Sequence, residues 1–146
     1  MSQTALTELR DALADTLLAD SAMAGLTSPP GVYAGEAKPT ASLNYVVIGP
    51  VLRDADESYL NGHDGRGHQR RLSFWARTQT TAEAMYARAV TLLDRARLDV
   101  DGHTVITASL ALEAGPVKAK TRPDDPTRGE VCWGIHARWT VRTLEA

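Results

Sequence analysis

The N-terminal segment repeats leucine at the spacing of a helix. The leucines follow one another at steps of three and four, with acidic residues on the opposite face: Leu6, Leu9, Leu13 and Leu17. This pattern predicts an amphipathic helix over about residues 4–24, with Gly25 as its C-cap. After the turn residues that follow Gly25, residues 32–34 form a short extended piece.

Two strands with a long polar connection are predicted next. Residues 43–53 carry apolar side chains on both faces, which is typical of a strand that is central in a sheet or covered by another subunit. Residues 68–77 return with an apolar face and a polar face. Between them, residues 54–67 contain the stretch NGHDGRG, whose Gly, Asn and Asp residues favour tight turns. The interpretation is a long hairpin loop.

The second half of the chain predicts a helix and two further strands. Thr80 and Glu83 have the spacing of a capping box and precede apolar residues at helical intervals. Residues 105–113 and 131–143 alternate as strands, and the second of them has the clearest amphipathic pattern in the chain. Residues 114–130 contain three prolines and a charged run, so a second long loop is predicted there.

The predicted order is therefore helix, strand, strand, helix, strand, strand. Such an order favours an α+β fold in one domain over residues 1–146. We expect an antiparallel sheet of about four strands with two helices packed on one face.

Composition excludes several classes of protein. With 43% hydrophobic and 23% charged residues, the chain resembles an average globular domain. The longest apolar run is far shorter than the roughly 20 residues of a membrane span, so no membrane partner is expected. The acidic N-terminus does not resemble a secretory signal. The chain has 16 Lys and Arg residues against 18 Asp and Glu residues, so it has no overall positive charge that would attract nucleic acid.

The residues that carry chemistry are scattered. Four histidines and the single Cys132 share no metal-ligand spacing, and Cys132 is expected to be a small packed side chain. NGHDGRG lies between two strands, whereas a phosphate-binding loop joins a strand to a helix. Ser73 or Ser109 with a distant His and Asp would be an arrangement that the sequence cannot show. We therefore expect no enzyme, no cofactor and no metal.

A basic region is the best local candidate for a contact surface. The cluster of Arg66, His68, Arg70 and Arg71, with Arg77 further along, could meet phosphate, but alternation divides it between two strand faces. The alternative is a charged edge or a salt-bridged subunit contact. Trp75 lies on the polar face near Arg71 and Arg77, and Trp and Arg are enriched where protein surfaces bury one another. A partly covered Trp is the alternative. The predicted subunit or tail-tube interface comprises Arg66, Arg70, Arg71, Trp75, Arg77, Lys118, Lys120, Arg122 and Arg128.

Several stretches together carry a family resemblance. They are LTELRDALADTLLADSAMAGL, GVYAGEA, NYVVIGP, RRLSFWART running into TTAEAMYARAVTLLDRA, and WGIHARWTVRT. Over nearly the whole chain they resemble the tail-completion or tail-terminator proteins of long-tailed bacteriophages, which also occur in prophages and gene transfer agents. The longer 114–130 loop departs from that pattern, as do Ser42 and Leu43 where the family often has proline.

The resemblance implies a structural virion protein. Its subunits would form a homo-oligomeric ring, commonly a hexamer, that caps the tail tube and joins the tail to the head. The implied partners are the major tail tube protein and a head-completion or connector protein, and DNA would pass through the ring without specific binding. The implied location is the head-proximal end of the virion tail, assembled in the cytoplasm of the bacterial host.

Other functions stay open at this point. One is a small nucleic-acid-binding module that uses the basic region from Arg66 to Arg77, for which salt-dependent DNA binding is the discriminating observation. Another is a different head-tail connector protein. A small enzyme ranks last, because it would need a pocket with convergent polar groups and perturbed titrating residues.

Overall fold

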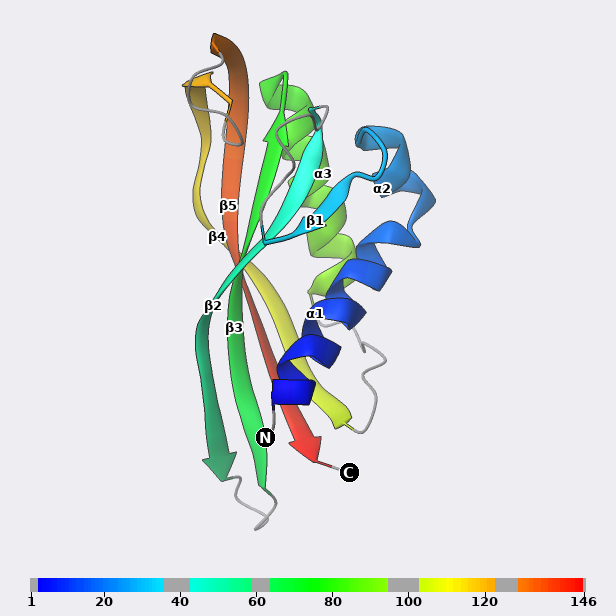
Figure 1. Cartoon of the computed structure of the whole chain (residues 1–146), viewed down its shortest axis with the longest axis vertical. Coiled ribbons are helices and arrows are strands. Elements are labelled where there is room, and N and C mark those ends of the chain that lie inside the picture. The colour runs from blue at the N-terminus through cyan, green and yellow to red at the C-terminus, as the bar shows by residue number, and fades with distance from the viewer. Residues whose placement is uncertain (1–2, 36–42, 59–63, 95–102, 123–128, 146) are drawn as a thin grey trace.

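The fold has two layers, with helices on one face of a five-stranded sheet (Figure 1). The computed structural model describes residues 3–35, 43–58, 64–94, 103–122 and 129–145. The elements are α1 (Gln3–Leu18), α2 (Ser21–Leu26), β1 (Val32–Ala34), β2 (Tyr45–Ser58), β3 (Asp64–Ala76), α3 (Gln79–Leu93), β4 (His103–Thr121) and β5 (Gly129–Glu145). The predicted α+β class is confirmed.

The strand order is β1-β2-β3-β5-β4, which differs from the prediction in its number of strands. The predicted count of four omitted β1, the short extended piece, which pairs in parallel with β2 through Val32 and Val46. The other neighbouring pairs are antiparallel. Three residues carry too little pattern to be recognised as a strand, and the parallel pairing with β2 is what makes them one.

The predicted first helix is two helices, because Asp20 interrupts it. Asp20 adopts an extended conformation and its carboxylate accepts a hydrogen bond from the Met23 N–H at 2.8 Å, which caps α2. Arg88 of α3 donates to both carboxylate oxygens at 2.8 and 2.6 Å. The bonds from Arg88 and then Met23 hold the pKa of Asp20 at about 2. Gly25, the predicted C-cap, lies inside α2.

The cap of α3 also differs from the prediction. Thr78 is the N-cap, and its hydroxyl accepts from the Thr81 N–H at 3.2 Å. The predicted capping box is therefore wrong, since the helix begins before Thr80. Glu83 instead accepts a hydrogen bond from Gln79 at 2.9 Å, one helical turn away.

The two predicted loops are largely strands. Residues 54–58 and 64–67 continue β2 and β3 as a paired hairpin, and residues 114–121 continue β4. Polar residues can form these strand extensions because the hydrogen bonds between strands come from the backbone and do not depend on the side chains. Register shifts accompany Pro50 in β2 and Gly115, with φ of 110°, in β4. The remaining loop residues, 59–63 and 123–128, lie outside the described residues.

The main core lies between the sheet and the helices. The helices contribute residues that the periodicity predicted: Leu9, Leu13 and Leu17 from α1, and Ala82, Met85, Ala89 and Leu93 from α3. Across them lie sheet residues such as Leu72, Phe74, Ile135 and Trp139, all nearly inaccessible to solvent. We call this helix-covered side of the sheet the inner face and the opposite side the outer face. The alternation of the third predicted strand places Ile106, Ala108, Leu110 and Leu112 on one face, but only Ala108 and Leu110 of these are buried. Ile106 and Leu112 are exposed on β4, the edge strand, and a register shift falls at Ile106.

Candidate assembly surfaces

The predicted interface residues of β3 divide between the two faces of the sheet. Side chains alternate along a strand, so Arg66 and Arg70 share the inner face with Leu72, while Arg71 and Trp75 lie on the outer face. The structure therefore does not bring the predicted basic region together as one patch. Only its outer-face members are placed to meet another molecule through the sheet.

Arg66 is held by two carboxylates of β2. Its guanidinium donates two hydrogen bonds of 2.8 Å to Asp54 and one of 2.7 Å to Asp56. The side chains of Arg66 and Asp54 are only 15% and 11% exposed. Hydrogen bonding to Arg66 lowers the pKa of the Asp54 carboxyl despite its partial burial, and Asp54 in turn raises the pKa of Arg66. This arrangement fastens the hairpin and leaves little of Arg66 for a partner.

Arg70 and His68 lie further inside the same face. Burial lowers the pKa of Arg70, and the nearby charge of Arg10 on α1 adds to that effect. Burial also lowers the pKa of His68, which packs edge to face against Trp139 with ring centroids 6.0 Å apart. Nδ1 of His68 lies 3.5 Å from the Asp54 carboxylate. These groups belong to the interior, so Arg70 does not join an exposed patch.

The outer face carries a charged network centred on Glu113. Its carboxylate accepts from Nη2 of Arg138 at 2.9 Å and lies 3.6 Å from Nε of Arg71. Both arginine side chains are nearly half exposed, at 45% and 44%. Two positive charges therefore share one negative charge on this surface.

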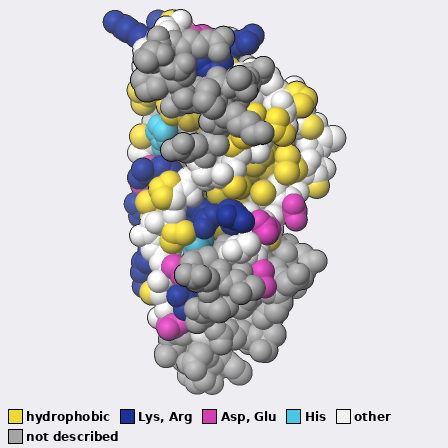
Figure 2. Space-filling model, in the orientation of Figure 1, with side chains coloured by type: hydrophobic (Ala, Val, Ile, Leu, Met, Phe, Trp, Pro, Cys, Tyr) yellow, Lys and Arg dark blue, Asp and Glu magenta, His cyan; other side chains and the backbone are white. Residues whose placement is uncertain are grey.

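Two further arginines extend this surface, and sequence reasoning did not connect them with Arg71. Arg53 is paired with Gln69 in the outer-face row next to the one that pairs Arg71 with Arg138, and Arg142 is paired with Gly67 in the row beyond that. Directly paired residues point to the same side of a sheet, so all four arginines lie on the outer face. We call Arg53, Arg71, Arg138 and Arg142 the arginine face. Figure 2 shows dark blue side chains along the margin of the molecule that faces away from the helices.

Trp75 anchors a small second core on the outer face. It packs with Tyr45 and Cys132, which are fully buried. Gly134 is required opposite it, because a Cβ there would lie 2.6 Å from the Trp75 ring. Trp75 is thus the partly covered tryptophan of the alternative interpretation, and the predicted packed role of Cys132 is confirmed.

His136 sits beside this second core. Its ring lies 5.4 Å from that of Trp75, and its Nδ1 lies 2.8 Å from Oγ of Ser73. Burial and the charge of Arg71 lower the pKa of His136, while Glu113 opposes them. The sequence could not show this serine and histidine together, because they meet only through the β3–β5 register.

The remaining predicted residues lie at the end of the sheet where β3 and β4 finish. Arg77 is exposed and 3.8 Å from Glu130, and Nζ of Lys118 lies 6.0 Å above the Trp133 ring. Arg122 is buried and 3.4 Å from the same Glu130. Lys120 is exposed. Arg128 lies outside the described residues.

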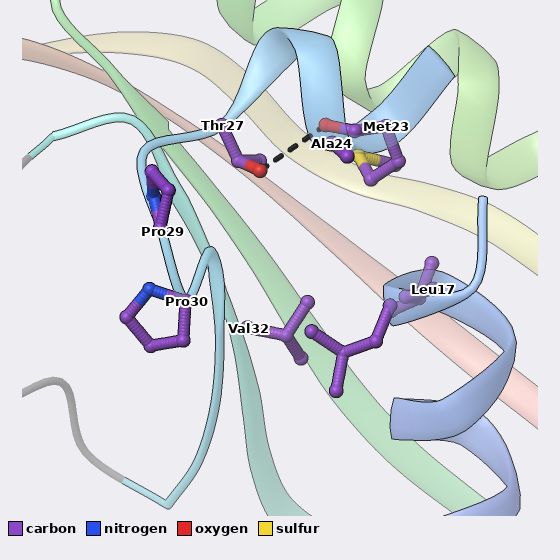
Figure 3. Close-up of a pocket in the computed structure, with 8 residues that line it drawn as sticks. Leu17, Met23, Ala24, Thr27, Pro29, Pro30 and Val32 are labelled. Atoms are coloured by element: carbon purple, nitrogen blue, oxygen red, sulfur yellow. Dashed lines mark hydrogen bonds between the residues drawn. The ribbon is translucent and has the colours of Figure 1, made fainter. Parts of the chain in front are cut away.

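An apolar hollow opens at the corner between α1, α2 and β1. Leu17, Met23 and Val32 point into it, and Pro29 and Pro30 close one side (Figure 3). The hollow has a volume of about 170 Å³, and Leu18 on its rim is 50% exposed. Figure 2 shows hydrophobic side chains gathered on this side of the molecule. No polar group converges there among the lining residues except Thr27, which donates to the Met23 carbonyl at 3.1 Å.

The sheet presents two long open edges within the described residues. β4 is an edge strand over its whole length, and β2 is an edge from Val51 onward because β1 pairs only with residues 46–48. Large apolar side chains on these edges are between 38% and 52% exposed: Val51, Leu52, Ile106, Leu112 and Val117. Open edges and exposed apolar residues are what a subunit covers on assembly.

Within the described residues, no group of three or more His, Cys, Asp or Glu side chains is placed to hold a metal ion. No described helix is long and apolar enough to cross a membrane.

Comparison with known proteins agrees with the fold and the sequence. The model of the family "Tail completion protein gp17" matches residues 11–125. A chain in the solved structure of the virion of a native gene transfer agent particle has the same fold, with a TM-score of 0.70 and 22% sequence identity, over 98% of this chain and 99% of that one. A search of curated protein sequences found no match.

Proposed function

The chain belongs to the tail completion protein gp17 family, and on this premise we propose that it is the ring-forming subunit that ends the tail tube and joins it to the head. Membership of the family makes it a structural protein of the phage tail type, located in the virion. The resemblance of the sequence to tail terminators supports the finer role. The proposed partners are further copies of the chain, the tail tube protein and a head connector.

The observation that carries the proposal is the pair of open sheet edges. β4, with 19 residues, has backbone groups along one side that pair with no other described strand. Exposed edges with apolar side chains invite pairing with another chain, and a monomer that kept them uncovered would tend to aggregate. In a closed ring every subunit has a neighbour on either side, so assembly buries surface that a monomer leaves uncovered.

The hairpin of β2 and β3 and the arm of β4 and β5 suit this role. They project at opposite ends of the molecule, beyond the helices (Figure 1). We propose that these projections, which replace the two predicted loops, carry contacts to neighbouring subunits and to the tube. Lys118 and Lys120 on the arm, with Trp133 beneath Lys118, are the side chains that we expect to take part.

Two measurements test the proposal. Native mass spectrometry of the purified protein should give a closed oligomer, with a hexamer as the expected species. Particles from the producing cells should contain the protein in the same small copy number, at the end of the tail next to the head when labelled with an antibody. A chain that is strictly monomeric and never found in particles would disprove the proposed function.

A further inference from the structure

Arg71 and Arg138 form the positively charged centre of the arginine face, on a chain whose net charge is −2. Glu113 is the described acid that pairs with Arg71 and Arg138, and one carboxylate cannot balance two guanidinium groups. Neutral side chains fill the rows between the arginines, among them Gln69, Thr140 and Ser109. None of the described helices covers this side of the sheet (Figure 1). Such a surface attracts negative charge.

A negative surface lies on α1, on the other side of the molecule. Asp11 and Asp15 are exposed and lie one helical turn apart, so they share one face of the helix. Thr7, Leu18 and Ala19 are exposed on the same side. Arg10 lies 3.4 Å from Asp11 and offsets part of its charge, so Asp15 is the main acid of the stripe. We call Asp11 and Asp15 the acidic stripe.

The two surfaces face in opposite directions. Figure 1 places α1 on the helix side of the subunit, and the arginine face is the reverse side of the sheet. Contacts between opposite sides of identical subunits are heterologous, and they generate rings when the rotation closes. We propose that the arginine face of one copy binds the acidic stripe of α1 in the next copy. This inference rests on the proposed ring and identifies the surfaces that form it.

The spacing of the charges is compatible with this contact. Paired residues on neighbouring strands lie about 5 Å apart, which is the spacing of Arg71 and Arg138. Asp11 and Asp15 are separated by about 6 Å along the helix axis. A helix that crosses the strands can therefore bring both aspartates to both arginines. Leu18 and the apolar hollow beside the stripe would supply the apolar part of the same contact.

A charge swap tests the contact directly. Arg138→Glu and Asp15→Lys each place like charges opposite one another, and each should reduce the assembled fraction of the full-length chain by about tenfold or more. The double variant restores opposite charges and should regain most of the assembly. Glu83→Lys is the matched control for Asp15→Lys, because it places the same positive charge at an exposed acid of α3, outside the acidic stripe. Thermal unfolding of each variant identifies any loss of folding.

The readouts are native mass in solution and the copy number in particles from cells that carry each variant. Rescue by the double variant, with normal assembly of Glu83→Lys, supports the contact. Assembly of both single variants at the wild-type level overturns it and leaves the proposed function intact. Loss in Glu83→Lys, or no rescue in the double variant, also overturns it. If Arg138→Glu weakens salt-dependent binding of duplex DNA while assembly persists, the face binds nucleic acid and the inference is wrong. A wild-type chain that neither assembles nor enters particles contradicts the proposed function itself.

Discussion

Arg66 and Arg71 lie on the same strand, yet they have opposite uses. Arg66 points to the inner face, is 15% exposed and is held by Asp54 and Asp56. Arg71 points to the outer face, is 44% exposed and shares Glu113 with Arg138. The parity of a strand position, and not the identity of the residue, decides whether a charge fastens the fold or is available to a partner. We therefore expect inner-face substitutions to change stability and outer-face substitutions to change assembly.

The largest expected difference between the faces concerns two tryptophans. Trp139 is fully buried in the inner-face core, so Trp139→Ala should lower the free energy of unfolding by about 3–5 kcal/mol. Trp75 is only partly buried in the smaller outer core, and Trp75→Ala should cost less. Chemical denaturation of both variants measures the difference. Equal losses would mean that the outer core contributes as much as the inner one.

The next effect distinguishes the two carboxylates that hold Arg66. Asp54→Ala leaves a mostly buried guanidinium with one partner fewer, and should cost about 2 kcal/mol of unfolding free energy. Asp56 is 80% exposed, so Asp56→Ala should cost less than about 1 kcal/mol. Urea denaturation of the two variants makes the comparison. A larger loss for Asp56→Ala would contradict the inner-face assignment.

The pH dependence of stability should sharpen the same contrast. Burial lowers the pKa of His68 from 6.5, so the unfolded chain binds a proton more readily than the folded one. The stability of a fold that holds His68 neutral is fully present above pH 6.5, and it is lost as the pH falls from there through the folded pKa of His68. His68→Gln should make the unfolding free energy fall less between pH 7 and pH 5. Part of the fall should remain in the variant, because the pKa of His136 is also lowered. An unchanged slope in the variant would show that His68 does not titrate as described.

The smallest stability effects are expected on the outer face. Arg71→Ala and Arg138→Ala remove exposed ion pairs and should each change the free energy of unfolding by less than about 1 kcal/mol. Calorimetry of the two variants checks this. A loss comparable with that of Asp54→Ala would mean that the Glu113 network is structural, and the comparison between the two faces would fail.

The sequence was a good guide where structure depends on local pattern. The periodicity predicted the buried residues of α3, and the alternation of β3 and β5 predicted their core faces, because burial acts on each element separately. The leucine repeat also hid the break at Asp20, since the carboxylate acts there as a cap that Arg88, distant in sequence, holds in place. The polar ends of the hairpins could not be recognised as strands without their pairing partners.

The candidate surface was less predictable than the fold. Arg71 was identified from the sequence, but Arg53 and Arg142 join it only through the register of three strands. The predicted division of the basic region by alternation is confirmed, since Arg66 and Arg70 lie on the other side of the sheet from Arg71. Which arginines gather is a property of strand pairing, and a single sequence does not specify that pairing.

The central claim is that the chain is a ring-forming tail subunit, and its assembled mass tests this most directly. Native mass spectrometry at physiological salt should give one closed oligomer, expected to be six times the chain mass of 15.8 kDa, with the same stoichiometry in purified particles. A single species at the mass of one chain, together with particles that lack the protein, would contradict the account.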